Sequence, residues 1–168
     1  MSHLEPGFYY LINVKHARGK GVESANFHEV GQDVGALDLS GGDGTSIISF
    51  PWHGGDNQKW EFIPADNGHY HIRNAQQGKY ITFPDEPNDG KQVIATDGPR
   101  EWEVRLGHEG VNDKDEQVSV RIFVPGTEQN LDLTNHGDIT PGNPVQLWSR
   151  TPGQGQAWYA VNAPPPGQ

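Results

Sequence analysis

The side chains of this chain that could do chemistry are histidines and carboxylates, because it has 8 His, 22 Asp and Glu, and no Cys. His69 and His71 lie two residues apart, a spacing that puts both imidazoles on one strand face and can chelate zinc. The sequence places no third ligand beside them, so exposed strand residues are the better interpretation. The acidic run 112–116 lacks the alternating ligands and fixed glycine of a calcium loop, which favours a solvated turn.

Motifs for covalent catalysis are missing from the sequence. There is no Gly-x-Ser-x-Gly, and without cysteine there is no thiolate nucleophile, disulfide or thiolate metal site. Carboxylates are plentiful enough for a glycosidase pair, but nothing in the sequence singles out two of them. We therefore expect no catalytic residue, no metal and no cofactor.

Tryptophans mark an internal repeat that must position whatever site the chain has. Gln58-Lys59-Trp60 and Gln156-Ala157-Trp158 are full Q-x-W motifs, and Arg100-Glu101-Trp102 is a degenerate one. The intervals are 42 residues (60 to 102) and 56 residues (102 to 158). Repeats of this length decide the architecture of a chain. We predict a three-unit fold in which the three motif tryptophans are core residues.

Short alternating or β-branched runs bounded by turn residues recur along the chain, whereas helical periodicity is nearly absent. The expected strands are 7–14, 36–40, 46–50, 59–64, 69–74, 79–83, 92–96, 101–106, 117–124, 130–134, 144–149 and 157–162. Three four-stranded units predict an all-β fold, the β-trefoil, in which six strands form a short barrel and six cap its base. Three blades would be too few for a propeller.

We expect one domain over residues 1–168, with repeats at about 6–66, 67–110 and 111–163. The segment 17–34 is interpreted as a surface insertion, because it is rich in glycine and charge. The proline-rich tail 163–168 is expected to fray.

The net charge and the composition limit the classes of molecule that the chain is expected to bind. The net charge is −10 and no Lys/Arg cluster offsets it, which argues against nucleic acid and anionic lipid. No signal peptide is visible, and no apolar stretch approaches the ~20 residues that span a bilayer. Together with the missing cysteines, this favours a cytoplasmic protein without membrane insertion.

The chain resembles the ricin-B-type β-trefoil lectins, and most closely the small cytosolic lectins of mushrooms. The resemblance rests on the run 6–13, on Leu37-Asp38-Leu39-Ser40-Gly41-Gly42 with Asn57-Gln58-Lys59-Trp60, and on their counterparts Leu131-Asp132-Leu133-Thr134 and Gln156-Ala157-Trp158. It covers everything except the insertion and the tail. It implies a lectin without catalysis that binds galactose- or N-acetylgalactosamine-type glycans or glycoproteins. Two sites, or a homodimer, would strengthen weak binding.

The resemblance also implies a shallow sugar pocket built from an Asp, an aromatic platform and an Asn or Gln. A carboxylate accepts hydrogen bonds from adjacent hydroxyls, and a flat indole covers the apolar face of a pyranose. In the first unit the matching residues are Asp38, Trp52, His53, Asn57 and Gln58. In the third unit they are Asp132, Trp148 and Gln156, with Gln154 as a substitute for the Asn expected where Gly155 stands.

The residues themselves support part of this assignment. Asp38 and Asp132 each lie between two leucines, so alternation turns them away from the core, and it also turns Trp148 outward. The second unit has Thr82 in place of the Asp and no aromatic residue in 92–96. We interpret it as scaffold that has lost sugar binding, and we expect the first unit to hold the better site.

Two other functions remain open on the sequence alone. Some mushroom trefoils inhibit proteases through surface loops, for which the insertion 17–34 and the loop 84–90 are candidates. The degenerate second unit and the missing third-unit Asn also fit an accessory subunit that binds no sugar.

Overall fold

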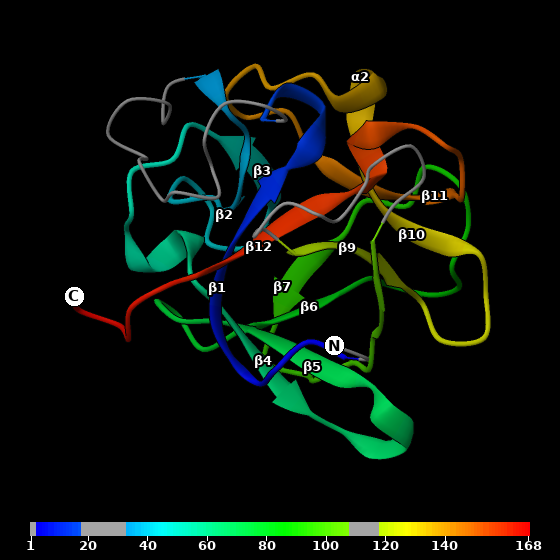
Figure 1. The fold of residues 1–168 in the computed structure, drawn as a ribbon, viewed down its shortest axis with the longest axis horizontal. Coiled ribbons are helices and arrows are strands. Elements are labelled where there is room, and N and C mark those ends of the chain that lie inside the picture. The colour runs from blue at the N-terminus through cyan, green and yellow to red at the C-terminus, as the bar shows by residue number, and fades with distance from the viewer. Residues whose placement is uncertain (1–2, 18–32, 108–117) are drawn as a thin grey trace.

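The computed structural model describes residues 3–17, 33–107 and 118–168, and the described chain is built from twelve strands (Figure 1). The strands are β1 (Gly7–Asn13), β2 (Ala36–Leu39), β3 (Ile47–Phe50), β4 (Trp60–Pro64), β5 (Tyr70–Asn74), β6 (Tyr80–Thr82), β7 (Ile94–Thr96), β8 (Glu103–Leu106), β9 (Val118–Phe123), β10 (Gln129–Leu133), β11 (Val145–Ser149) and β12 (Trp158–Asn162). The prediction of an all-β chain with four strands in each repeat is confirmed.

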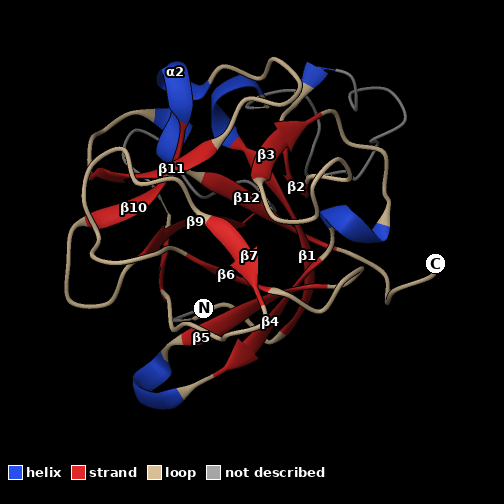
Figure 2. Cartoon of the chain, turned by 180° about the vertical axis from the view of Figure 1, so that it is seen from behind, coloured by secondary structure: helices blue, strands red, loops and turns tan. Residues whose placement is uncertain are grey.

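The helical segments of these ranges are single turns: η1 (Val14–His16), η4 (Asp56–Gln58), η5 (Asp66–Gly68), η6 (Gln154–Gln156) and α2 (Thr134–Gly137). Figure 2 shows them at the ends of the strands. None of the helices described is long and apolar enough to cross a membrane.

The first and fourth strands of each repeat form a ring. Antiparallel pairing joins β12 to β1, β1 to β4, β4 to β5, β8 to β9 and β9 to β12. The remaining gap, between β5 and β8, is closed by an antiparallel bridge between Tyr70 and Trp102, which exchange two backbone hydrogen bonds. The six strands therefore make the closed barrel expected of a trefoil.

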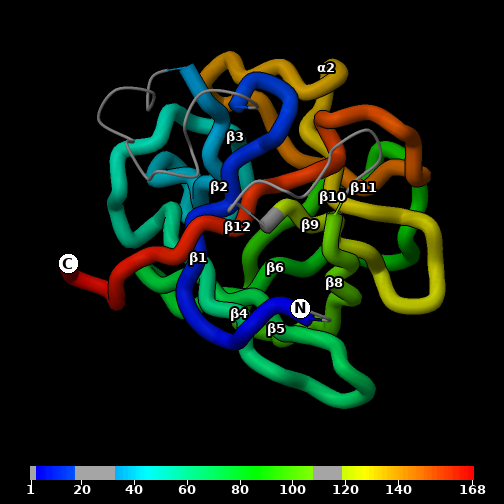
Figure 3. Tube along the Cα trace, viewed as in Figure 1, coloured from blue at the N-terminus to red at the C-terminus, as the bar shows by residue number. Residues whose placement is uncertain are grey.

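The second and third strands of each repeat form hairpins that cap this barrel, namely β2–β3, β6–β7 and β10–β11. Single bridges connect the three hairpins to one another: Ser46 to Ile94, Ile48 to Pro144, and Gln92 to Gln146. The course of the chain through them can be followed in Figure 3. Each hairpin thus supports the other two, and each presents its own outer face.

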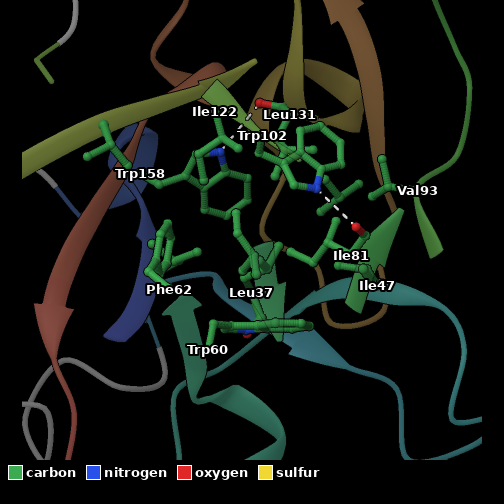
Figure 4. Close-up of a cluster of buried hydrophobic side chains, with 14 of the residues drawn as sticks. Leu37, Ile47, Trp60, Phe62, Ile81, Val93, Trp102, Ile122, Leu131 and Trp158 are labelled. Atoms are coloured by element: carbon green, nitrogen blue, oxygen red, sulfur yellow. Dashed lines mark hydrogen bonds between the residues drawn. The ribbon is translucent and has the colours of Figure 1, made fainter. Parts of the chain in front are cut away.

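The three motif tryptophans lie in the core, as predicted. Trp60, Trp102 and Trp158 are each 0 % exposed, and Figure 4 shows them among aliphatic side chains from all three repeats. Each indole Nε1 donates a hydrogen bond to a hairpin carbonyl. The acceptors, with their distances, are Leu37 (2.9 Å), Ile81 (3.0 Å) and Leu131 (3.4 Å). Each tryptophan therefore fastens its barrel strand to the hairpin of the same repeat.

A second apolar cluster lies beside β1 and holds the ends of the predicted insertion. Ala17 and Val34 are buried there with Tyr10 and Ile12. Residues 18–32, which make up most of the predicted insertion 17–34, lie outside the described residues.

The prediction that the tail 163–168 frays is wrong. The Lys59 ammonium is 0 % exposed; it pairs with Asp56 at 3.0 Å and donates to the carbonyls of Pro165 and Gln168. The Gly167 N–H in turn donates to Asp56. A buried ammonium is costly unless its three donors are satisfied, and the tail supplies two of the acceptors.

We expect Trp102→Phe to lower the free energy of unfolding by about 1–3 kcal/mol, because it leaves the buried Ile81 carbonyl without its donor. Trp148→Phe is the matched control. Its side chain is 40 % exposed, so the change should stay within about 0.5 kcal/mol. Urea unfolding of both variants measures the difference, and equal losses would contradict the role given to the buried indole.

Candidate functional site

In the first repeat, the motif glutamine holds the aspartate from below. Gln58 is 0 % exposed. Its Nε2 donates to Asp38 Oδ2 at 2.9 Å and to the Pro51 carbonyl at 3.0 Å, and its Oε1 accepts from the backbone N–H of His53 at 2.9 Å. The sequence assigned Gln58 to sugar contact. Its burial and its saturated amide instead make it a positioning residue that fixes Asp38 and the loop after β3.

Asp38 itself is only 3 % exposed. The flanking leucines predict that the Asp38 side chain points away from the core. It does so, but other side chains cover it. His53 Nε2 lies 3.7 Å from Asp38 Oδ2, and the His53 side chain is 45 % exposed. Burial raises the pKa of Asp38 above its ordinary value, against the opposing effects of the Gln58 hydrogen bond and the nearby His53. Asn57, also predicted in the site, donates to the Leu39 carbonyl at 3.2 Å.

Among the described residues of the first repeat, the exposed aromatic side chain is Phe50, where the sequence favoured Trp52. Phe50 is 39 % exposed, and its ring lies edge-on to His53 at a centroid distance of 6.1 Å. The Trp52 ring is half-buried and packs edge-on against Tyr10 at 5.6 Å. Strand register shows that Phe50 is the residue equivalent to Trp148 of the third repeat. Phe50 stands two residues from the partner of Asp38 on the facing strand, as Trp148 does for Asp132.

The third repeat contains an open pocket of about 300 Å³ on the face of β10 and β11. It brings together two residues predicted from the sequence, Asp132 and Trp148, with four that were not. The four are Asn135, His136, Gln146 and Thr151. Trp148 is 40 % exposed, so an aromatic surface and a carboxylate share one concavity.

Asp132 is held by two amides. Gln156 Nε2 donates to its Oδ2 at 2.9 Å and Gln146 Nε2 to its Oδ1 at 3.3 Å. Gln156 is 2 % exposed and its Oε1 accepts from the Thr151 N–H at 2.8 Å and from Arg121 Nη1 at 3.0 Å. Like Gln58, Gln156 positions the aspartate from beneath. Burial raises the pKa of Asp132, although both amide hydrogen bonds oppose the shift.

The position of the asparagine that the sequence sought in the third repeat is tightly packed. Gly155 occupies its place, and a Cβ built there would lie 3.0 Å from the backbone nitrogen of Gly137. The turn α2 therefore fills the space, and it carries Asn135 and His136, both with positive φ (55° and 58°), to the pocket instead. Gln154, predicted as the substitute, does not line this pocket. The Asn135-His136-Gly137 run after Leu-Asp-Leu-Thr is the sequence signal for this turn.

The second repeat keeps the arrangement with other residue types. Arg100 stands where the other repeats have glutamine, and its Nε donates to Thr82 Oγ1 at 2.8 Å. Thr82 takes the place of the aspartate and Thr96 that of the aromatic residue. Among the residues described, no group of three or more His, Cys, Asp or Glu is placed to hold a metal ion.

The raised pKa of Asp132 predicts the sign of a pH effect on stability. A carboxyl whose pKa is higher in the folded chain stabilises the fold below its ordinary value of 3.8, and this stability is lost as pH rises through the folded value. Asp132→Asn removes the ionisation. We therefore expect the unfolding free energy of the variant, relative to the native chain, to increase between pH 3 and pH 7.

Asp43→Asn is the control with the opposite sign. Hydrogen bonds from Ser46 and Thr45 lower the pKa of Asp43 to about 2, so its ionised form stabilises the fold as pH rises, and this variant should lose relative stability over the same range. Urea unfolding at both pH values measures the two effects. Equal slopes for the two variants would contradict the environment described for Asp132.

Comparison with known proteins agrees with this geometry. A family model described as ricin-type beta-trefoil lectin domain-like matches residues 3–96 and again residues 56–148. The second match is displaced by about one repeat, as expected for a chain with internal threefold similarity. No protein in the curated collection of sequences matches the chain.

Solved structures match over nearly the whole chain. A ricin B-like lectin of Macrolepiota procera, solved in complex with lactose, is 34 % identical, with a TM-score of 0.76 over 96 % of this chain and 99 % of that one. The Rhizoctonia solani agglutinin is 21 % identical, with a TM-score of 0.72 over 95 % and 96 %. ThreeFoil, a designed threefold-symmetric protein, is 24 % identical, with a TM-score of 0.65 over 93 % and 99 %.

The last two matches share the fold, and the first shares sequence as well. The buried Q-x-W tryptophans, the capped six-stranded barrel and the family match over residues 3–148 lead to the same assignment. The chain belongs to the ricin-type β-trefoil lectin family.

Proposed function

We propose that this protein is a lectin for galactose- or N-acetylgalactosamine-type glycans and that its principal site is the third-repeat pocket. Membership of the lectin family and the lactose complex of the Macrolepiota procera relative support carbohydrate binding. Sugar recognition needs hydrogen-bonding groups and an aromatic surface and no reacting group. We therefore assign the site binding without catalysis.

The observation that carries the proposal is the position of Asp132 opposite an exposed indole. Each carboxylate oxygen of Asp132 accepts one hydrogen bond from an amide, from Gln156 or from Gln146. One lone pair on each oxygen then remains for a ligand, which matches two neighbouring hydroxyls of one sugar ring. Trp148, 40 % exposed in the same pocket, offers a flat surface to the C–H face of that ring.

The rest of the pocket completes the polar contacts. Asn135 and His136 line it from α2, and Thr151 from the loop after β11. Buried partners fix this arrangement: the Gln156 Oε1 holds the Thr151 backbone, and Arg121 Nη1 holds Gln156. A site whose polar groups are already in place loses less conformational entropy when the sugar binds.

The first repeat supplies a second, weaker site in this proposal. It has the carboxylate of Asp38 and the exposed ring of Phe50, but His53 lies 3.7 Å from the carboxylate and leaves Asp38 3 % exposed. A sugar hydroxyl must compete with His53 for Asp38. Two unequal sites on one chain would still raise the avidity for multivalent glycoproteins.

Titration with lactose tests the assignment. The hydrogen bonds to a charged carboxylate contribute about 1.5–3 kcal/mol, so Asp132→Asn should weaken binding by about 10- to 100-fold. Trp148→Ala should weaken it for an independent reason, the loss of stacking. Asp66→Asn, an exposed carboxylate on η5 outside both sites, controls for the change in net charge.

The result against the site assignment is a lactose titration that neither Asp132→Asn nor Asp38→Asn alters. A folded native chain that binds neither lactose nor any glycan on an array would reject the lectin proposal itself. The amide spectrum of the unliganded protein establishes folding in each case.

A further inference from the structure

The second repeat, whose motif is degenerate, has a pocket of its own. It has a volume of about 700 Å³, against about 300 Å³ for the pocket of the third repeat. The side chains that matter to its chemistry are His69, Thr82, Thr96, Arg100 and Glu101.

This pocket occupies the position that the proposed sugar pocket has in the third repeat. Thr82 pairs with Ile94 across the β6–β7 hairpin, as Asp132 pairs with Gln146 across β10–β11. Thr96, two residues beyond Ile94, takes the place of Trp148. Arg100 stands two residues before the core tryptophan, where the third repeat has Gln156. The second and third repeats therefore present equivalent concavities with different linings.

The base of the second-repeat pocket carries the opposite charge to the base of the third-repeat pocket. In the third repeat a neutral amide donates to a carboxylate, from Gln156 to Asp132, at 2.9 Å. In the second, a guanidinium donates to a neutral hydroxyl, from Arg100 to Thr82, at 2.8 Å. The same structural link thus changes the formal charge at the base of the pocket from −1 to +1. A site with a free cation selects a ligand that carries an anion.

Arg100 is held ready for such a ligand. Its guanidinium carbon lies 3.9 Å from the centre of the Phe83 ring, and its Nη2 donates to the Phe83 carbonyl at 3.3 Å. With the bond to Thr82, these contacts fix the plane of the group and engage two of its five N–H donors. Over the described ranges, Arg100 takes part in no ion pair. A fixed guanidinium with unused donors binds a carboxylate or sulfate through two parallel hydrogen bonds.

The one carboxylate in the pocket is already engaged. Glu101 Oε1 lies 2.8 Å from His69 Nδ1, and the His69 side chain is 21 % exposed. This contact turns Glu101 toward the histidine and leaves Arg100 without a carboxylate partner. The hydroxyls of Thr82 and Thr96 line the same space and suit the hydroxyls of a sugar ring.

We propose that the second-repeat pocket binds an acidic saccharide, with the carboxylate or sulfate of the sugar on Arg100 and its hydroxyls on the threonines. The chain's net charge of −10 opposes any anion at long range. That repulsion is screened beyond about 8 Å at physiological ionic strength, whereas the contact with Arg100 is direct. This site is independent of the neutral-sugar sites, since it shares no residue with them.

Matched ligands and variants test the proposal by following backbone amide shifts in the full chain. Methyl β-glucuronide should shift the amides around Arg100, and methyl β-glucoside, its uncharged counterpart, should not. Arg100→Gln should weaken glucuronide binding by at least tenfold. Arg73→Gln, which removes an exposed arginine paired with Glu61, should leave it unchanged. Glutamine is the residue that the other two repeats carry at this position, so the fold should accept it.

Arg100→Lys is the second variant and separates charge from geometry. It keeps the charge but not the planar fork, so it should bind glucuronide more weakly than the native chain and more tightly than Arg100→Gln. If Arg100→Gln does not fold, the comparison of Arg100→Lys with the native chain decides alone. Equal binding of glucuronide and glucoside by the native chain would overturn the proposal. Equal glucuronide binding by the native chain and the Arg100 variants would also overturn it.

Two further arms identify the ligand and keep the sites apart. Galactose 6-sulfate should compete with the glucuronide, whereas inorganic sulfate that competes as well as either sugar would show an anion site without saccharide recognition and overturn the proposal. Asp132→Asn should weaken lactose binding and leave glucuronide binding unchanged. If the native chain binds the glucuronide but no lactose, the proposed lectin site of the third repeat fails while the second-repeat site stands.

Discussion

The fold and the sites of this protein both depend on a clamp made by two residues of the Q-x-W motif. In the first repeat Trp60 binds the carbonyl of Leu37, and Gln58 binds the side chain of the next residue, Asp38. In the third, Trp158 and Gln156 hold Leu131 and Asp132 in the same way. Successive residues of a strand point to opposite faces. The tryptophan bond lies in the core, where the indoles are 0 % exposed, and the glutamine bond holds an aspartate side chain that points to the other face.

This coupling explains how one scaffold carries three different surfaces. The tryptophan bond fixes the hairpin relative to the barrel regardless of which residue stands at the glutamine position. In the second repeat Trp102 still holds Ile81, while Arg100 holds Thr82. The first position of the motif, held by glutamine or arginine, can therefore differ between repeats and change the chemistry of the pocket. The packing of the core stays the same. Function in such a fold belongs to the site and not to the architecture.

Local patterns in the sequence predicted most of the fold. Alternation and turn residues located all twelve strands, and the repeat identified the three core tryptophans. The burial of Lys59 and the docking of the tail were not predictable, because they arise from contacts between residues more than a hundred positions apart. The conformation of such segments is determined by tertiary packing and not by local propensity.

Part of the arrangement at the candidate sites could be predicted from the sequence. The aspartates and Trp148 follow from the Leu-Asp-Leu runs and from alternation. Phe50 was missed because the hairpin loops of the first and third repeats differ in length. The resemblance pointed to Trp52, whereas strand register selects Phe50. Gln58 and Gln156 have the right donors for a sugar, but the sequence does not show that the protein already uses them.

The contact between Gly137 and Gly155 limits what the third-repeat pocket can become. Restoring an asparagine at position 155 would push a side chain against the backbone of α2, 3.0 Å away. Asn135 and His136 lie on that turn, so a side chain at position 155 would also shift two residues that line the pocket. The first repeat, with Asn57, and the third repeat, with Gly155 and α2, are therefore different arrangements of the same hairpin. Recombining their halves by design, or by unequal exchange between repeats, would have to transfer the turn and the glycine together.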